Sequence, residues 1–138
     1  RLEKCLKVFK IFDPDVVYHG IYTNQWNPTL NCIARGYVPA EAFDKDRLLK
    51  EQYIPGACLF KKECWAKKPF RYETQYAFDF MMHLDWTFSG FKYYNLDIGL
   101  YEYVRQENSA SITYEKDGRR KQSMDKIKEI LKNEYATG

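Results

Sequence analysis

The segment 75–89, QYAFDFMMHLDWTFS, is apolar on nearly every side when it is wound as a helix. A helix of this kind is usually buried in the core of a domain. Asp79, His83 and Asp85 interrupt it, and the first two share a stripe with Thr87 at helical spacing. A carboxylate on such a helix costs free energy unless it is paired, hydrated in a cleft or used in chemistry. The segment therefore predicts a core helix that carries a candidate site.

The composition favours a folded domain without a nucleic-acid partner. The 138 residues are 45% hydrophobic and 17% aromatic, which can supply a sizeable core. A net charge of +3, spread along the chain, predicts neither DNA nor RNA binding. No apolar run is long enough to span a bilayer, and the charged opening RLEK is unlike a secretory leader. We expect a cytoplasmic protein, with 1–138 forming a single domain or a fragment of one.

The cysteines predict free thiols rather than a metal site. They are Cys5, Cys32, Cys58 and Cys64, and no two of them form a Cys-x-x-Cys pair. The chain has only two histidines, so a structural zinc site is not expected. The apolar neighbours of the cysteines are typical of buried thiols in a reducing compartment, and a secreted disulfide framework is the weaker alternative.

Helical and strand patterns are mixed along the chain. Amphipathic periodicity predicts helices over 1–12, 43–51, 61–67 and 120–135. β-Branched and aromatic residues predict strands over 16–23, 32–38, 57–60, 91–97 and 98–105. Loops are expected at 24–31, 68–74 and 108–117, and Gly90 is expected to cap the buried helix. Mixing of elements without strict alternation indicates an α/β or α+β layered architecture.

The predicted helices at the two ends of the chain bear on what the chain associates with. The first predicted helix has no capping residue before it, and several strands look fully apolar. We therefore expect a sheet that continues beyond 1–138, exposed apolar surface and self-association. Residues 119–138 are predicted to be a C-terminal helix and tail. Its basic residues suit peripheral membrane contact, but acidic residues dilute their charge and favour a solvated face.

Asp79 and its neighbours have alternative interpretations from the residues alone. Asp79 is either a structural carboxylate, satisfied by backbone donors or an arginine, or a general base in a cleft. His83 is either a hydrogen-bonded core histidine or a metal ligand on the same helix face. The strand that contains Tyr101 and Tyr103 suits a sugar ring or the edge of a packed sheet equally well.

Three stretches of the chain contain sequence motifs that follow one another in a recognisable order. They are RLEKCLKVFKIFDPDVVYHG, FDKDRLLKEQYIPGACLFKKECW and PFRYETQYAFDFMMHLDWTFSGFKYYNLDIGLYEYVRQENSAS. The first resembles the helix and strand that follow the Asp-x-Asp motif of family 2 glycosyltransferases with the GT-A fold. The second resembles the stretch leading into that family's Gly-Ala/Ser strand. The third resembles its Glu-Asp helix, Gly-Tyr/Phe-Lys and Tyr-Arg-x-His-x-x-Ser-x-Ser series, so the likeness covers most of the chain.

The resemblance implies an inverting, nucleotide-sugar-dependent glycosyltransferase of surface-polysaccharide synthesis, with a glycan or lipid-linked acceptor. Asp79 matches the aspartate that deprotonates the acceptor hydroxyl in that family. The residues that match positions near the donor and acceptor are Gly56, Ala57, Ser109 and Ser111. We expect the acceptor cleft to be shaped by Trp86, Tyr101 and Tyr103. The implied fold is α/β, a partial GT-A (nucleotide-diphospho-sugar transferase-like) fold with a mixed sheet flanked by helices.

The chain also departs from the family pattern. Phe78 stands where the family has a glutamate before the base, and Gln106 stands where many members have a histidine. No Asp-x-Asp motif with a preceding strand occurs in the sequence, so the donor-binding half is expected upstream of Arg1. Most ligands of a divalent Mg or Mn ion would lie there too, and this chain alone is expected to be inactive. The alternative is a non-catalytic carbohydrate-binding or protein-interaction domain.

Overall fold

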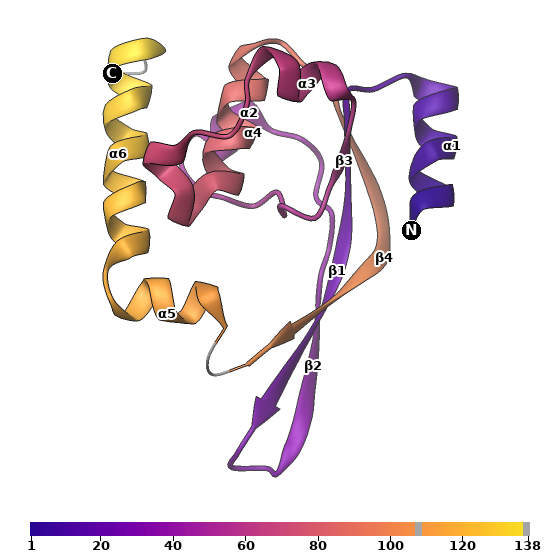
Figure 1. Cartoon of the computed structure of the whole chain (residues 1–138). Coiled ribbons are helices and arrows are strands. Elements are labelled where there is room, and N and C mark those ends of the chain that lie inside the picture. The colour runs from indigo at the N-terminus through magenta and orange to yellow at the C-terminus, as the bar shows by residue number, and fades with distance from the viewer. Residues whose placement is uncertain (107–108, 137–138) are drawn as a thin grey trace.

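One long strand organises the molecule, for which the computed structural model describes residues 1–106 and 109–136 (Figure 1). The strands are β1 (Val16–Asn27), β2 (Cys32–Val38), β3 (Leu59–Phe60) and β4 (Tyr93–Arg105). β1 pairs in parallel with β4 on one side. On its other side it pairs antiparallel with β3 near its start and with β2 over its second half. The result is a mixed, open sheet, which confirms the coarse α/β expectation.

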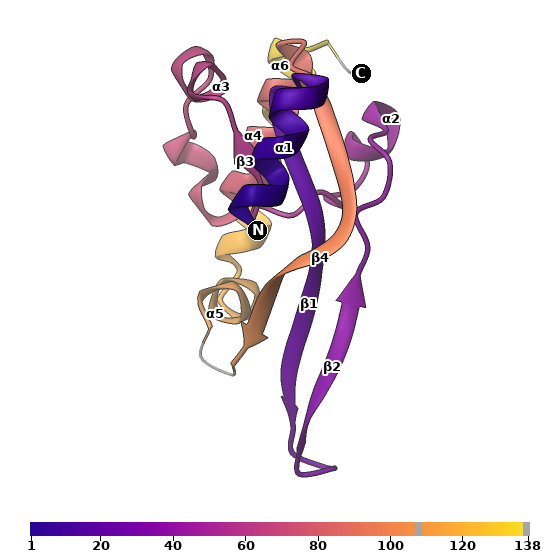
Figure 2. The ribbon, with the colours of Figure 1, turned by 90° about the vertical axis from the view of Figure 1, so that its right-hand side faces the viewer.

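Helices cover both faces of this sheet. They are α1 (Leu2–Phe12), α2 (Lys45–Leu48), α3 (Lys62–Lys67), the 3-10 segment η1 (Tyr72–Ala77), α4 (Phe78–Phe88), α5 (Ala110–Lys116) and α6 (Arg119–Glu134). Figures 1 and 2 show α1 on one face, with α4 and α6 on the opposite side. The β1–β2 hairpin projects beyond the helices (Figure 1).

The core lies on both sides of the first half of β1. Val16 and Tyr18 belong to the larger apolar cluster, which includes most of α4 and the inner face of α6. Val17, between them, belongs to a smaller cluster with Cys5 and Val8 of α1. Side chains alternate between the two faces of a strand, so the continuous apolar start of β1 is buried on both faces.

The buried helix predicted from the sequence is confirmed. Every residue from Phe80 to Trp86 in α4 is buried. The helix ends at Ser89, and Gly90 follows it with a φ of 82°, a left-handed conformation that suits glycine at a helix end. The two terminal helices are also confirmed as α1 and α6, and α6 buries Ile127 and Ile130.

Several predicted strands and loops were wrong. The expected loop at 24–31 instead continues β1 to Asn27, whose side chain then accepts hydrogen bonds from the backbone N–H groups of Thr29 and Leu30 in the hairpin turn. The two strands expected over 91–105 are the single strand β4. Its register against β1 shifts where Gly20 pairs with Gly99, which explains why the sequence pattern breaks there.

Other short elements are longer or shorter than the sequence predicts. The expected loop at 108–117 contains α5, although residues 107–108 lie outside the described part of the chain. The helix expected over 43–51 is only the single turn α2, and the strand expected over 57–60 is only β3. The expected loop at 68–74 ends in η1. Tertiary packing decides such short segments more than local propensity does.

All four cysteines are free thiols. Three are buried, and burial raises the pKa of Cys58 to about 12 and that of Cys64 to about 11. Burial of Cys32 was predicted wrongly, because this residue begins β2, which is exposed along its whole length.

Several regions keep large apolar side chains in contact with solvent, among them α1 and the β1–β2 hairpin. On α1 they are Leu2, Leu6, Ile11 and Phe12, and on the hairpin they include Trp26, Leu30 and Ile33. Exposed apolar surface of this kind favours association, and self-association stays a prediction. Within 1–106 and 109–136, no helix combines the length and apolar character needed to cross a membrane.

Candidate functional site

Asp79, in the first turn of α4, lines two adjoining hollows of about 470 and 330 Å³. Ile21, Pro55 and Tyr103 also line both of them, so the two form one site. We call it the Asp79 hollow. It is lined in addition by Gly56, Ala57 and Tyr101 at its smaller end and by Gln52, Arg105, Ser111, Glu115 and Arg120 at its larger end.

Most of the site residues expected from the sequence meet in this hollow. The segment around Gly56, the start of α4, the second half of β4 and the start of α5 each contribute at least one of them. Ser111 is held by a hydrogen bond between its Oγ and the Tyr103 hydroxyl at 3.0 Å. The Ser109 hydroxyl lies 3.4 Å from that of Ser111, but Ser109 is not among the residues that line the hollow.

The carboxylate of Asp79 is oriented by a chain of two hydrogen bonds. Its Oδ2 accepts a hydrogen bond of 2.6 Å from the Gln52 side-chain nitrogen. The Gln52 side-chain oxygen in turn accepts one of 2.9 Å from the guanidinium of Arg120. Arginine has only donors, so this contact fixes the amide with its NH₂ group toward Asp79. Oδ1 accepts from the backbone N–H of Phe80 at 3.0 Å, and each carboxylate oxygen keeps a further lone pair for a ligand.

Gly56 allows the loop to approach this carboxylate. A Cβ on Gly56 would lie 3.0 Å from the Asp79 Cβ and 3.2 Å from its Oδ2. Both distances are tighter than ordinary van der Waals contact, so a side chain here would push Asp79 aside. The sequence resemblance implies a small residue near the sugars at this position, and the structure places it against the candidate base.

His83 lies in the core behind the hollow. Its Nε2–H donates to the Pro55 carbonyl at 3.2 Å, and its Nδ1 accepts from the Tyr93 hydroxyl at 3.0 Å. Burial lowers the pKa of His83 to about 4, so the imidazole is neutral at physiological pH. With both nitrogens occupied, His83 anchors the segment that precedes Gly56.

The part of the chain that the structure describes does not by itself provide a site for the divalent ion that the resemblance implies. No group of three or more His, Cys, Asp or Glu side chains in it is arranged to hold a metal. Asp79 and Glu115 are the acidic groups of the hollow, and they line its larger part together with two arginines. No step of the chemistry is therefore assigned to a metal here.

Trp86 does not line the Asp79 hollow. It is fully buried, its indole N–H donates to the Lys68 carbonyl at 2.9 Å, and its ring lies 4.7 Å from that of Phe60. Trp86 follows Asp79 by two turns of α4, so both residues lie on the same side of the helix. Trp86 is nevertheless buried more deeply than Asp79. Asp79 is at the open end of the helix and Trp86 is in the core.

Sequence reasoning missed several residues of the hollow. Gln52 and Arg105 lie in stretches that carry the resemblance but were assigned no role in the site, and Arg120 lies outside these stretches. The fold brings all three to the Asp79 hollow. Strand periodicity offers the one available signal, because Tyr101, Tyr103 and Arg105 alternate along β4 and therefore share a face.

No protein-family model, curated protein or solved structure matches this chain. The geometry of the Asp79 hollow offers a fixed carboxylate, aromatic walls and hydroxyl groups around a space open to solvent, which suits a polyhydroxylated ligand.

Proposed function

We propose that this chain is the acceptor-side part of an inverting family 2 glycosyltransferase, in which Asp79 is the general base. One observation carries the proposal: Gly56, Ala57 and Ser111, which the resemblance names in distant segments, line one hollow together with Asp79. A structural carboxylate at this point of the fold would need no such lining. The fixed orientation of Asp79 by Gln52 also supports a role in chemistry.

The reaction assigned to Asp79 is proton removal from an acceptor hydroxyl. A hydroxyl bound in the hollow donates to a free lone pair of the carboxylate. As its oxygen forms a bond to the anomeric carbon, the proton passes to Asp79 and the bond from that carbon to the nucleotide diphosphate breaks. Attack from the side opposite the leaving group inverts the anomeric configuration. The rings of Tyr101 and Tyr103 offer the apolar faces on which a sugar can rest.

A divalent cation would stabilise the leaving diphosphate in such a reaction. The described residues hold no complete site for it, and the proposal assigns its ligands, with the donor-binding half, to sequence outside this chain. We further propose a cytoplasmic location, which the three buried free thiols support.

The test is an assay of the natural protein that contains this chain, with nucleotide-sugars, Mg or Mn, and glycan or lipid-linked acceptors. Asp79→Asn keeps an acceptor for Gln52 but removes the base, so we expect kcat to fall by about 10²–10⁴-fold with donor affinity unchanged. The matched control is Asp125→Asn, which alters an exposed carboxylate of α6 and should leave turnover intact.

Two outcomes would overturn the proposal. Unchanged turnover in Asp79→Asn would remove Asp79 from the role of base. Glycan binding without any donor-dependent product would instead support the non-catalytic carbohydrate-binding alternative, since the same aromatic lining could serve both.

A further inference from the structure

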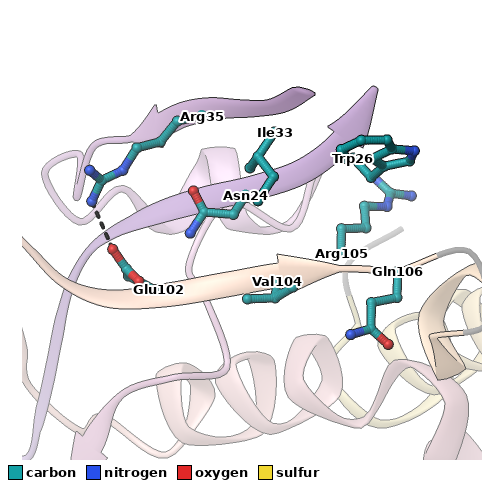
Figure 3. A pocket seen from close by; sticks show the side chains of 8 residues that line it. All are labelled: Asn24, Trp26, Ile33, Arg35, Glu102, Val104, Arg105 and Gln106. Atoms are coloured by element: carbon teal, nitrogen blue, oxygen red, sulfur yellow. Dashed lines mark hydrogen bonds and ion pairs between the residues drawn. The ribbon is translucent and has the colours of Figure 1, made fainter. Parts of the chain in front are cut away.

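A second hollow, of about 600 Å³, lies on the projecting part of the sheet (Figure 3). We call it the hairpin hollow, and its main lining residues are Asn24, Trp26, Ile33, Arg35, Glu102 and Val104. Its volume is within the range of about 300–1,000 Å³ that is usual for small-molecule sites. None of the site residues expected from the sequence lines it.

The hairpin hollow and the Asp79 hollow lie on opposite faces of one sheet. Tyr101 and Tyr103 of β4 line the Asp79 hollow, whereas Glu102 and Val104 line the hairpin hollow. Successive side chains of a strand point to opposite faces, so the alternation places the two hollows on opposite sides of β4. Arg105, at the end of the strand, lines both of them. A ligand stacked on Trp26 and a ligand at Asp79 would therefore contact different residues, apart from Arg105.

The wall and floor of the hairpin hollow are apolar and exposed. Trp26 pairs with Ile33 across β1 and β2, and Val104 of β4 completes the strip. These three side chains are 50%, 65% and 58% exposed. Figure 3 shows the indole of Trp26 at one end of the hollow, with the Arg105 side chain reaching toward it. A flat, accessible aromatic ring beside an apolar floor suits the C–H face of a sugar ring.

The other end of the hairpin hollow carries polar side chains. Arg35 is held in place by neighbouring residues, whereas Asn24 is available to a ligand. Arg35 donates to Glu102 at 2.8 Å, and its guanidinium lies 4.5 Å from the centre of the Tyr22 ring, so two contacts fix its position. Asn24 lies opposite Arg35 in the β1–β2 register. Its amide has no hydrogen-bond partner among the residues that the structure describes, so it can both donate to and accept from a ligand hydroxyl.

The charges of the hollow are compensated. Arg35 is paired with Glu102, and Arg105 lies 3.7 Å from Glu115. A site for phosphate, an acidic sugar or nucleic acid needs uncompensated positive charge. The hairpin hollow instead combines an apolar strip with neutral and paired polar groups, which favours a neutral ligand that carries hydroxyls.

We propose that the hairpin hollow binds a neutral saccharide chain, with one sugar ring stacked on Trp26 and its hydroxyls bonded to Asn24 and to the Arg35–Glu102 pair. None of these four contact residues lines the Asp79 hollow. The hairpin hollow would hold a glycan whether or not the chain belongs to a transferase.

The test uses ¹H–¹⁵N NMR of the chain with three neutral probes: maltohexaose, cellohexaose and mannohexaose. We expect at least one probe to shift the indole N–H signal of Trp26 and the side-chain amide signal of Asn24. Trp26→Ala should weaken that binding at least tenfold. The matched control is Trp65→Ala, because Trp65 is similarly exposed, at 44%, but lies on α3 away from the hollow.

The outcomes separate this proposal from the one for Asp79. Asp79→Asn should leave the affinity of the probe unchanged, so loss of transfer and loss of this binding are independent results. The proposal is overturned if no probe shifts Trp26, or if Trp26→Ala binds as well as the unaltered chain. It is also overturned if the Trp26 signal responds only to protein concentration, because the hollow would then be an interface between copies.

Discussion

Two carboxylates of α4 have different surroundings although they belong to the same apolar helix. Asp85 is 1% exposed and receives two hydrogen bonds from Arg71, at 2.7 and 2.8 Å, and a third from Tyr135. Asp79 is half-buried in the first turn, and one side of it is open to the hollow. The lone pairs of Asp85 are therefore engaged within the fold, whereas Asp79 can still accept a proton from a ligand.

The buried histidines predict a loss of stability in mild acid. Burial lowers the pKa of His83 to about 4, and it also lowers the pKa of His19. Between pH 6.5 and about 4, the unfolded chain binds a proton at His83 that the folded chain does not. His83 should therefore lower the unfolding free energy by about 1.4 kcal/mol per pH unit below pH 6.5, and the lowered pKa of His19 should add to this loss. Urea unfolding between pH 7 and pH 5 would measure the total.

The variant His83→Gln isolates one of the two contributions. Glutamine does not titrate, so the fall in unfolding free energy between pH 7 and pH 5 should become smaller by the contribution of His83, and the contribution of His19 should remain. Carboxylates held by cations, such as Glu134, have lowered pKa values and titrate below this window. An identical pH dependence in the variant and the unaltered chain would show that His83 is not the group responsible.

At the scale of elements, the helices were more predictable than the strands. The long periodic patterns in the sequences of α1, α4 and α6 predict that these helices exist and roughly where each begins and ends. Both strands of the hairpin were predicted, and the prediction for β2 is confirmed from Cys32 to Val38. The end of β1 was missed because its polar residues pair only once Trp26 and Ile33 face each other across the two strands. For the site, motif order indicates Asp79, Gly56 and the residues of β4, but contacts from distant segments, such as the one from Arg120, depend on the fold.

The irregular pairing of β1 and β4 depends on a glycine. A Cβ on Gly99 would lie 2.4 Å from Cε2 of the Tyr22 ring, which packs over this position. The ring cannot yield easily, so Gly99→Ala should lower the free energy of unfolding by about 1–3 kcal/mol in urea denaturation. Replacement of Tyr22 in the same chain should recover part of this loss, and strictly additive effects would contradict the contact.

Gly36→Ala is the matched control for this substitution. Its Cβ would meet the Thr23 hydroxyl at 2.6 Å, but that oxygen can move by rotation about a single bond. The loss of stability should therefore be smaller than for Gly99→Ala. Equal losses would indicate that any side chain on these strands is harmful, whatever it meets.

At the scale of the whole molecule, one arginine joins segments that are far apart in the chain. Arg71, just before η1, binds Asp85 of α4 and also Glu134 at the end of α6, with contacts of 2.7 Å to each. The ion pairs raise the pKa of Arg71 and lower that of Glu134, so both remain charged. This cluster fixes α6 against α4, and α6 carries Arg120 to the Asp79 hollow.

Removal of this arginine should be far more costly than removal of a surface cation. Arg71→Met would leave Asp85 buried without its counter-ion, and we expect the free energy of unfolding to fall by about 3–5 kcal/mol. Lys121→Met breaks only the exposed pair with Asp125, which should cost less than about 1 kcal/mol. Urea unfolding of both variants measures the contrast. Equal losses would mean that the cluster does not hold α6 in place, and that the position of Arg120 beside Gln52 needs another explanation.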